Sequence, residues 1–143
     1  MKKKLRILIV DDNPRARGAL SAFLSTMDGV NVSGEASNGE EALVHIEQRL
    51  PDIVLMDIQM PVMDGLQATR LIKKRWRQVK VIALTMYANY EAQAKEAGAD
   101  AVIIKGCPAE EMKTTIRLLA SKTPGKSSAM NTFVLSLERN DKV

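Results

Sequence analysis

Carboxylates, a hydroxyl and an ammonium group each follow a short apolar run of this 143-residue chain. They belong to Asp11, Asp12, Asp57, Thr85 and Lys105. If the apolar runs are strands of one parallel sheet, these side chains meet at the edge where ligands bind in open α/β sheets. Two like charges about 4 Å apart repel by about 4 kcal/mol at an effective dielectric constant of about 20, so three clustered carboxylates predict a divalent cation or raised pKa values. An all-oxygen site with few protein ligands favours Mg²⁺.

Asp57 ends a short, nearly uninterrupted apolar run. The residues before it, 53–56, read Ile-Val-Leu-Met, which is typical of a strand buried on both faces. Pro61 and then Asp64-Gly65 turn the chain before a helical pattern begins at Leu66. Taken alone, Asp57 is best explained as an acidic turn residue that closes a strand. The other polar strand ends change that interpretation in favour of a reactive carboxylate.

Five predicted strands alternate with five predicted helices. The strands are residues 5–10, 30–36, 52–57, 79–84 and 101–104, and the helices are residues 14–27, 39–50, 66–76, 89–97 and a last one from Pro108. This alternation, with right-handed crossovers, predicts a doubly wound five-stranded parallel sheet, the α/β flavodoxin-like (βα)5 fold with strand order 2-1-3-4-5. Gly34 interrupts the second strand, which we therefore expect at an edge.

This strand order specifies how far apart the polar residues stand. Asp11 and Asp12 face Asp57 across neighbouring strands, and Thr85 lies on the other side of Asp57, one strand spacing of about 4.8 Å away. Lys105 is two strands away, about 9–10 Å by the same spacing, so its long flexible side chain is needed to reach the acids.

Composition and charge describe an ordinary globular chain. Hydrophobic residues make up 45% and charged residues 27%, and the net charge of +4 comes largely from short basic runs that read first as solvated faces. We therefore expect no direct nucleic-acid binding.

The single Cys107 excludes an internal disulfide and a multi-cysteine metal site. No apolar run approaches the roughly 20 residues of a membrane span, and the short basic N-terminus does not read as a signal peptide, so we expect a cytoplasmic protein without membrane contact.

Five motifs, in order and at set spacings, resemble the receiver domain of bacterial two-component response regulators. They are Asp11-Asp12, Asp57 followed by Pro61 and Asp64-Gly65, Leu84-Thr85, Gly98-Ala99-Asp100, and Lys105. The resemblance covers residues 4–121. The segment Leu84-Thr85-Met86-Tyr87 is most similar to the corresponding segment of receivers that precede LuxR-type helix-turn-helix domains.

The resemblance implies that a sensor histidine kinase passes a phosphoryl group from its phosphohistidine to Asp57. It further implies that Mg²⁺ is bound by Asp12, Asp57 and the carbonyl of Gln59, with Asp11 acting through water. The protein would then be a signalling module and not an enzyme, apart from its own Mg²⁺-dependent phosphorylation and dephosphorylation.

The resemblance also assigns the remaining polar residues. Lys105 would pair with the phosphoryl group and Thr85 would move to hydrogen-bond it. Gln59 and Tyr87, two residues beyond Asp57 and Thr85, would tune the lifetime of the aspartyl phosphate by controlling the access of water.

Two positions depart from the family pattern. Val102 stands where an aromatic residue usually accompanies the motion of the threonine, which leaves Tyr87 or Tyr90 as alternatives for that coupling. Lys105 is followed by Gly106 rather than by proline, so the lysine–proline cis bond common in the family cannot form there.

The domain organisation limits the predicted output. We expect a receiver domain over residues 1–121 and a linker-like C-terminal tail over 122–143 without a recognisable output domain. Four interpretations of the tail stay open: it is disordered, it pairs at the edge of the sheet, it packs on the domain, or it is the remnant of a truncated regulator. Phosphorylation would therefore control self-association or partner binding, in a module that stands alone or regulates transcription. We favour a weak homodimer through the first and fifth helices over one through the fourth helix, fifth strand and fifth helix.

Two other classes of protein use similar strand ends. A haloacid-dehalogenase-type phosphatase also passes through an aspartyl phosphate, but it needs a second acid where this chain has Gln59. A flavodoxin-like nucleotide or flavin binder needs a Gly-rich phosphate loop after the first strand, where this chain has Asp11-Asp12-Asn13-Pro14.

Overall fold

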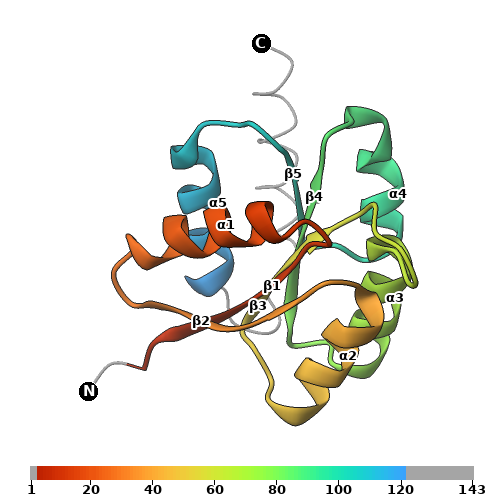
Figure 1. The fold of residues 1–143 in the computed structure, drawn as a ribbon, viewed down its shortest axis with the longest axis horizontal. Coiled ribbons are helices and arrows are strands. Elements are labelled where there is room, and N and C mark those ends of the chain that lie inside the picture. The colour runs from red at the N-terminus through yellow and green to blue at the C-terminus, as the bar shows by residue number, and fades with distance from the viewer. Residues whose placement is uncertain (1–2, 122–143) are drawn as a thin grey trace.

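The computed structural model describes residues 3–121 as one sheet covered by helices on both faces (Figure 1). The strands are β1 (Leu5–Val10), β2 (Val30–Ala36), β3 (Ile53–Asp57), β4 (Lys80–Thr85) and β5 (Ala101–Ile104). The helices are α1 (Pro14–Ser25), α2 (Gly39–Gln48), α3 (Gly65–Arg75), the short 3₁₀ helix η1 (Ala88–Tyr90), α4 (Glu91–Glu96) and α5 (Ala109–Ser121). The expected tail, residues 122–143, lies outside the described residues.

All strand pairs are parallel, and the strand order is β2-β1-β3-β4-β5. The predicted flavodoxin-like α/β fold is therefore confirmed. Helices α1 and α5 cover one face of the sheet, and α2, α3 and α4 cover the other (Figure 1). Because every strand runs in the same direction, the loops that follow β1, β3, β4 and β5 meet at a single edge.

Two apolar layers hold the helices on the sheet. Alternate residues of β1 and β3 point to opposite faces, as strand geometry requires. Ile7 and Leu55 pack with the α1 and α5 side, whereas Leu8 and Val54 pack with the α2 and α3 side. All five residues of β3 are buried, which explains why its sequence is apolar without alternation.

The predicted edge position of the second strand is also confirmed. The register of β2 against β1 shifts between Ile7, which pairs with Val32, and Leu8, which pairs with Gly34. A Cβ atom at Gly34 would lie 3.0 Å from Nδ1 of His45, so glycine lets α2 pack closely on this strand. One helix differs from its prediction, because the segment expected as one helix from Asn89 to Ala97 is split into η1 and a six-residue α4.

The turn after β3 folds back onto the end of its own strand. The N–H of Gly65 donates to the carbonyl of Ile58 at 2.7 Å, and a Cβ atom at Gly65 would overlap the carbonyl oxygen of Asp57. Asp64 caps α3 by accepting from the N–H of Gln67 at 2.9 Å. The Asp64-Gly65 pair thus fixes the backbone immediately beside Asp57. Within residues 3–121, no helix is long and apolar enough to cross a membrane.

Candidate functional site

Three carboxylates meet at the edge formed by the ends of β1 and β3. Asp11 is 1% exposed and Asp57 is 6% exposed, whereas Asp12 is exposed. Each of the three offers a carboxylate oxygen, and these oxygens lie within 4.8 Å of one another. The pairing of Val10 with Met56 explains this proximity, because it aligns the ends of the two strands. The structure therefore brings together the acids that the sequence predicted to be neighbours.

Lys105 reaches this cluster from the end of β5. Its Nζ lies 3.1 Å from Oδ2 of Asp11 and 3.1 Å from Oδ1 of Asp57. Its backbone N–H donates to the carbonyl of Thr85 at 2.7 Å, which anchors the lysine beside the intervening strand. One cation thus neutralises part of the charge of two buried carboxylates, across the two strand spacings that the sequence required it to span.

Burial and charge shift the pKa values of this pair. Burial raises the pKa of Asp57 above its ordinary value of 3.8, the neighbouring carboxylate of Asp11 raises it further, and Lys105 offsets part of this, giving a pKa of about 6. Burial lowers the pKa of Lys105, but the facing carboxylates of Asp57 and Asp11 outweigh burial, so that pKa lies above its usual value. At neutral pH Asp57 is therefore mostly ionised, but its negative charge raises the free energy of the folded state.

The turn after β1 is fixed by side chains that cap α1. The N–H of Asn13 donates to Oδ1 of Asp11 at 2.9 Å. The side-chain oxygen of Asn13 in turn accepts from the N–H groups of Arg15 at 2.8 Å and Ala16 at 3.3 Å. This satisfies two of the unpaired donors of the helix and orients the buried carboxylate of Asp11.

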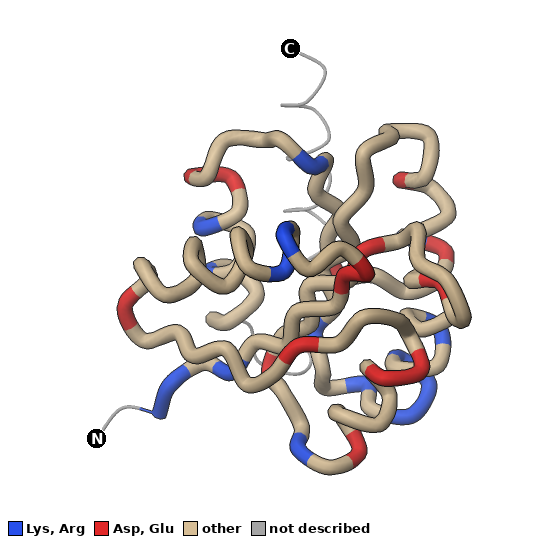
Figure 2. Tube along the Cα trace, in the orientation of Figure 1, with Lys and Arg blue, Asp and Glu red and all other residues tan. Residues whose placement is uncertain are grey.

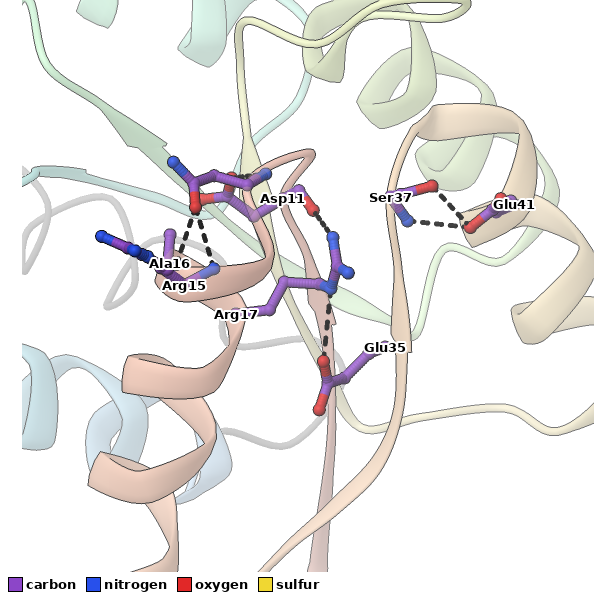
Figure 3. Close-up of polar contacts among 8 residues, drawn as sticks. Asp11, Arg15, Ala16, Arg17, Glu35, Ser37 and Glu41 are labelled. Atoms are coloured by element: carbon purple, nitrogen blue, oxygen red, sulfur yellow. Dashed lines mark hydrogen bonds and ion pairs between the residues drawn. The ribbon is translucent and has the colours of Figure 1, made fainter.

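Arg17 is a further anchor of this turn (Figure 3). Its Nη1 donates to the carbonyl of Asp11 at 2.6 Å, and its Nε donates to Oε1 of Glu35, on β2, at 3.3 Å. The guanidinium group therefore ties the acidic turn to the edge strand. Sequence reasoning missed Arg17. The available signal was an arginine in the first turn of the helix predicted after the acid pair, because a side chain there points back towards the turn that precedes the helix.

The loop after β4 is organised around Thr85. The Thr85 side chain is buried, and its hydroxyl oxygen accepts from the N–H of Tyr87 at 3.1 Å. The same hydroxyl donates to the carbonyl of Tyr87 at 3.3 Å. Met86 and Tyr87 are 62% and 54% exposed. In this structure the hydroxyl is thus occupied by its own loop, on the opposite side of Asp57 from Asp11.

Gln59 and Tyr90 approach each other from the loops after β3 and β4. Nε2 of Gln59 donates to the phenolic oxygen of Tyr90 at 3.0 Å. The rings of Tyr87 and Tyr90 are tilted by 52°, with their centroids 6.4 Å apart. Tyr90 and Val102 both pack against a small apolar cluster that is formed by Ile58, Ala83 and Ala94.

A mostly apolar cavity of about 390 Å³ opens between α1 and the start of α5. Its polar end is formed by Asp11 and Lys105, and its apolar walls include Leu20, Phe23 and Met112. Two residues of the acidic site therefore also line the contact zone between the first and fifth helices.

The comparisons with known proteins agree with this fold. The family model "Response regulator receiver domain" matches residues 7–117. The chain belongs to this family. The response regulator protein VraR of Staphylococcus aureus is 36% identical over 138 residues, which are 95% of this chain and 64% of VraR. This receiver chain thus spans about 64% of the length of the curated relatives it matches first.

Solved receiver structures superpose closely on this one. The signal receiver domain of NarL from Mycobacterium tuberculosis is 30% identical, with a TM-score of 0.76, over 85% of this chain and 100% of that one. A LuxR-family two-component response regulator from Aurantimonas sp. SI85-9A1 is 27% identical, with a TM-score of 0.79, over 96% of this chain and 99% of that one. The resemblance to receivers of LuxR-type regulators is thereby confirmed, and the phosphatase and flavin-binder alternatives are set aside.

Family membership gives the coarse function. Response regulator receiver domains act in phosphorylation-dependent two-component signalling, are generally phosphorylated by sensor kinases and use Mg²⁺ at an acidic pocket. The donors present here fit such an ion, because Asp11, Asp12 and Asp57 offer hard carboxylate oxygens from two adjacent strand ends. The individual roles expected for these residues, and for Gln59, Thr85, Tyr87 and Lys105, remain predictions.

Proposed function

We propose that Asp57 accepts a phosphoryl group from the phosphohistidine of a sensor histidine kinase and thereby switches the binding surface of this receiver. The observation that carries the proposal is the position of Lys105, whose Nζ lies 3.1 Å from Oδ1 of the buried Asp57. A cation at this distance is already in place to neutralise charge on a group attached to Asp57.

In the transfer, a carboxylate oxygen of Asp57 forms a bond to phosphorus while the phosphorus–nitrogen bond of the donor histidine breaks. The reaction requires in-line positioning and neutralisation of charge more than covalent help from other residues. A pKa of about 6 leaves Asp57 mostly ionised at neutral pH, as a nucleophile must be. Lys105 then exchanges part of its contact with the carboxylates for the new phosphoryl oxygens.

Asp12, Asp57 and the carbonyl of Gln59 would hold Mg²⁺, with Asp11 acting through a water molecule. The clustering of the three carboxylates supports this assignment, since unneutralised acids this close repel one another. When bound, the ion supplies positive charge to the phosphoryl oxygens.

Thr85 and Tyr87 provide the response to phosphorylation. The hydroxyl of Thr85 makes two contacts with the backbone of Tyr87. The N–H···O contact at 3.1 Å lies near the long end of its usual range, and the O–H···O contact at 3.3 Å is longer than is usual for its type. We expect this hydroxyl to leave its own loop and donate to a phosphoryl oxygen on Asp57. Tyr87 and Gln59, which flank the site, control the access of water and hence the lifetime of the aspartyl phosphate.

The output of the switch is a contact surface, with residues 1–121 as the receiver unit. We favour a homodimer through α1 and α5, because the cavity between these helices is lined by Asp11 and Lys105 and so adjoins the site. The similarity to a LuxR-family response regulator supports a receiver that is the regulatory part of a transcription regulator. Sedimentation of the protein with and without beryllofluoride and Mg²⁺ tests the dimer; identical monomeric profiles at all concentrations would remove its support.

Intact-mass measurement after incubation with acetyl phosphate tests the function itself. We expect uptake of one phosphoryl group with Mg²⁺, none in EDTA, and none in Asp57→Asn. Stable uptake by Asp57→Asn, or full uptake in EDTA, would contradict the proposal. A histidine kinase domain loaded with labelled phosphate then tests the donor, since label should pass to this chain and not to Asp57→Asn.

A further inference from the structure

One side-chain pair links the acceptor strand to the helix beyond the threonine loop. Gln59 stands two residues after Asp57, and Tyr90 stands five residues after Thr85. Nε2 of Gln59 donates to the phenolic oxygen of Tyr90 at 3.0 Å. The bond therefore joins the loop that follows the acceptor strand β3 to the helix η1, which follows the loop of Thr85.

The ring of Tyr90 is positioned by packing on both strands. It lies half-buried against the cluster of Ile58, Ala83 and Ala94. Ile58 directly follows the acceptor Asp57, and Ala83 stands two residues before Thr85. Val102, in place of a large aromatic residue, packs on the same cluster, and Tyr90 supplies an aromatic ring there. A ring held in this way presents its hydroxyl to Gln59 at a fixed place.

We propose that Tyr90 is a positioning residue that sets the lifetime of the aspartyl phosphate through the amide of Gln59. The inference rests on the proposed function, since it concerns the phosphoryl group on Asp57. In hydrolysis a water oxygen bonds to phosphorus, the bond from phosphorus to the Asp57 carboxylate oxygen breaks, and inorganic phosphate leaves. A primary amide both donates and accepts hydrogen bonds, so an unrestrained Gln59 can orient that water. The bond to Tyr90 directs the amide away from this role.

Tyr90→Phe is the decisive substitution, because it removes only the hydroxyl and keeps the ring on its cluster. We expect the phosphorylated variant to lose its phosphoryl group about threefold faster or more, which corresponds to the loss of one hydrogen bond. Asn89→Ala is the matched control, since Asn89 is an exposed polar residue of the same short helix. The phosphoryl group should be hydrolysed at the same rate in Asn89→Ala as in the protein without a substitution.

A double-mutant cycle distinguishes an effect through the Gln59 amide from a general destabilisation of the surrounding loops. Gln59→Ala removes the amide, so adding Tyr90→Phe to it should change the rate no further. Effects that multiply would overturn the inference, as would an unchanged or slower rate in Tyr90→Phe.

The bond itself is measured without phosphorylation. In ¹⁵N spectra of the unphosphorylated protein, Tyr90→Phe should shift the side-chain amide resonances of Gln59, and Asn89→Ala should not. If the unmodified protein takes up no phosphoryl group, the proposed function fails, whereas the amide resonances still report on the contact. If the protein is phosphorylated and the Gln59 side-chain resonances do not shift in Tyr90→Phe, the inference is wrong and the proposed function stands.

Discussion

The two sides of Asp57 are built differently. On one side, Asp11 is almost fully buried, and Lys105 contacts the carboxylates of both Asp11 and Asp57. Arg17 stabilises the same turn by donating to the carbonyl of Asp11. On the other side, the hydroxyl of Thr85 bonds to the backbone of Tyr87 in its own loop, and the side chains of Met86 and Tyr87 are exposed. Figure 2 shows acidic segments gathered where the strand ends of the first side meet.

The difference follows from what each side must do. Charge is stabilised most strongly where water is excluded and partners are fixed, which describes the side of Asp11 and Lys105. A loop that must rearrange and admit water belongs at the low end of local stability, with exposed side chains and few contacts. We therefore assign charge neutralisation to the first side, and timing and rearrangement to the second. Substitutions on the two sides should then affect different quantities.

Lys105→Met should have the largest effect on stability. The substitution keeps most of the apolar stem but leaves Asp11 and Asp57 facing each other without a cation. Because Lys105 is partly exposed, we expect a loss of about 2 kcal/mol in the free energy of unfolding, below the range for a fully buried pair. Urea unfolding in EDTA at neutral pH measures it. A loss within the error of the method would show that the first side is not held by charge.

The same variant should separate binding from response. Since the proposed metal ligands lie elsewhere, Lys105→Met should retain Mg²⁺ binding but lose most of the conformational change caused by phosphorylation. Amide chemical shifts with and without beryllofluoride report this, and an ordinary response in the variant would refute the role of Lys105.

Asp57→Asn should stabilise the metal-free protein at neutral pH. The folded-state pKa of about 6 lies above the ordinary 3.8, so the folded state disfavours the charged carboxylate. This cost is fully present above pH 6 and disappears as the pH falls towards 4, so the gain from Asp57→Asn should follow the same course. We expect about 1–2 kcal/mol at pH 7.5, from linkage discounted for solvent screening. Unfolding measured from pH 4 to 8 provides the test; a gain that grows on acidification has the wrong sign.

Arg17→Ala should have a smaller effect, centred on the acidic turn. It removes the donor to the carbonyl of Asp11 and the partner of Glu35. We expect a loss of about 1 kcal/mol in stability and about threefold weaker Mg²⁺ binding, since a charged hydrogen bond is lost beside the site. Calorimetric titration with Mg²⁺ measures the affinity. Glu35→Gln, which leaves the contact with Asp11 in place, is the matched control, and equal weakening in both variants would assign the effect to the surface ion pair.

Tyr87→Ala should have the smallest effect on stability but a clear effect on the hydrolysis rate of the aspartyl phosphate. Its side chain is 54% exposed, so we expect a change below about 0.5 kcal/mol in the free energy of unfolding. Tyr87 stands two residues beyond Thr85, and under the proposed function its ring shields the phosphoryl group, so the hydrolysis rate should change more than it does for any variant outside the acids, Thr85 and Lys105. Loss of label from phosphorylated protein gives this rate. Unaltered hydrolysis in both Tyr87→Ala and Gln59→Ala would show that the exposed side does not set the lifetime.

The fold and the composition of the site were predictable because both depend on local pattern. Each strand is an apolar run followed by a polar residue, and parallel strands necessarily bring such ends to one edge, which placed Asp57, Thr85 and Lys105 together. The interruption at Gly34 similarly identified the edge strand, and the register against β1 shifts immediately before this residue.

The contacts that the sequence did not reveal depend on loop paths rather than on periodicity. Arg17 reaches Asp11 and Glu35 only because α1 leaves its turn at a particular angle. Gln59 and Tyr90 are 31 residues apart and meet because the loop after β3 approaches the short helix η1. The split of the fourth helical segment into η1 and α4 places Tyr90, and no helical repeat in the sequence signals it.

Identification of the modified residue tests the central claim most directly, because three carboxylates lie within 4.8 Å of one another. Borohydride reduces an acyl phosphate to the alcohol and so marks the acceptor permanently. Trypsin should then release residues 7–15, with Asp11 and Asp12, separately from residues 50–70, with Asp57. We predict the mark in peptide 50–70, at Asp57 on fragmentation, and only after phosphorylation with Mg²⁺. A mark in peptide 7–15, or at another residue of peptide 50–70, would contradict the account.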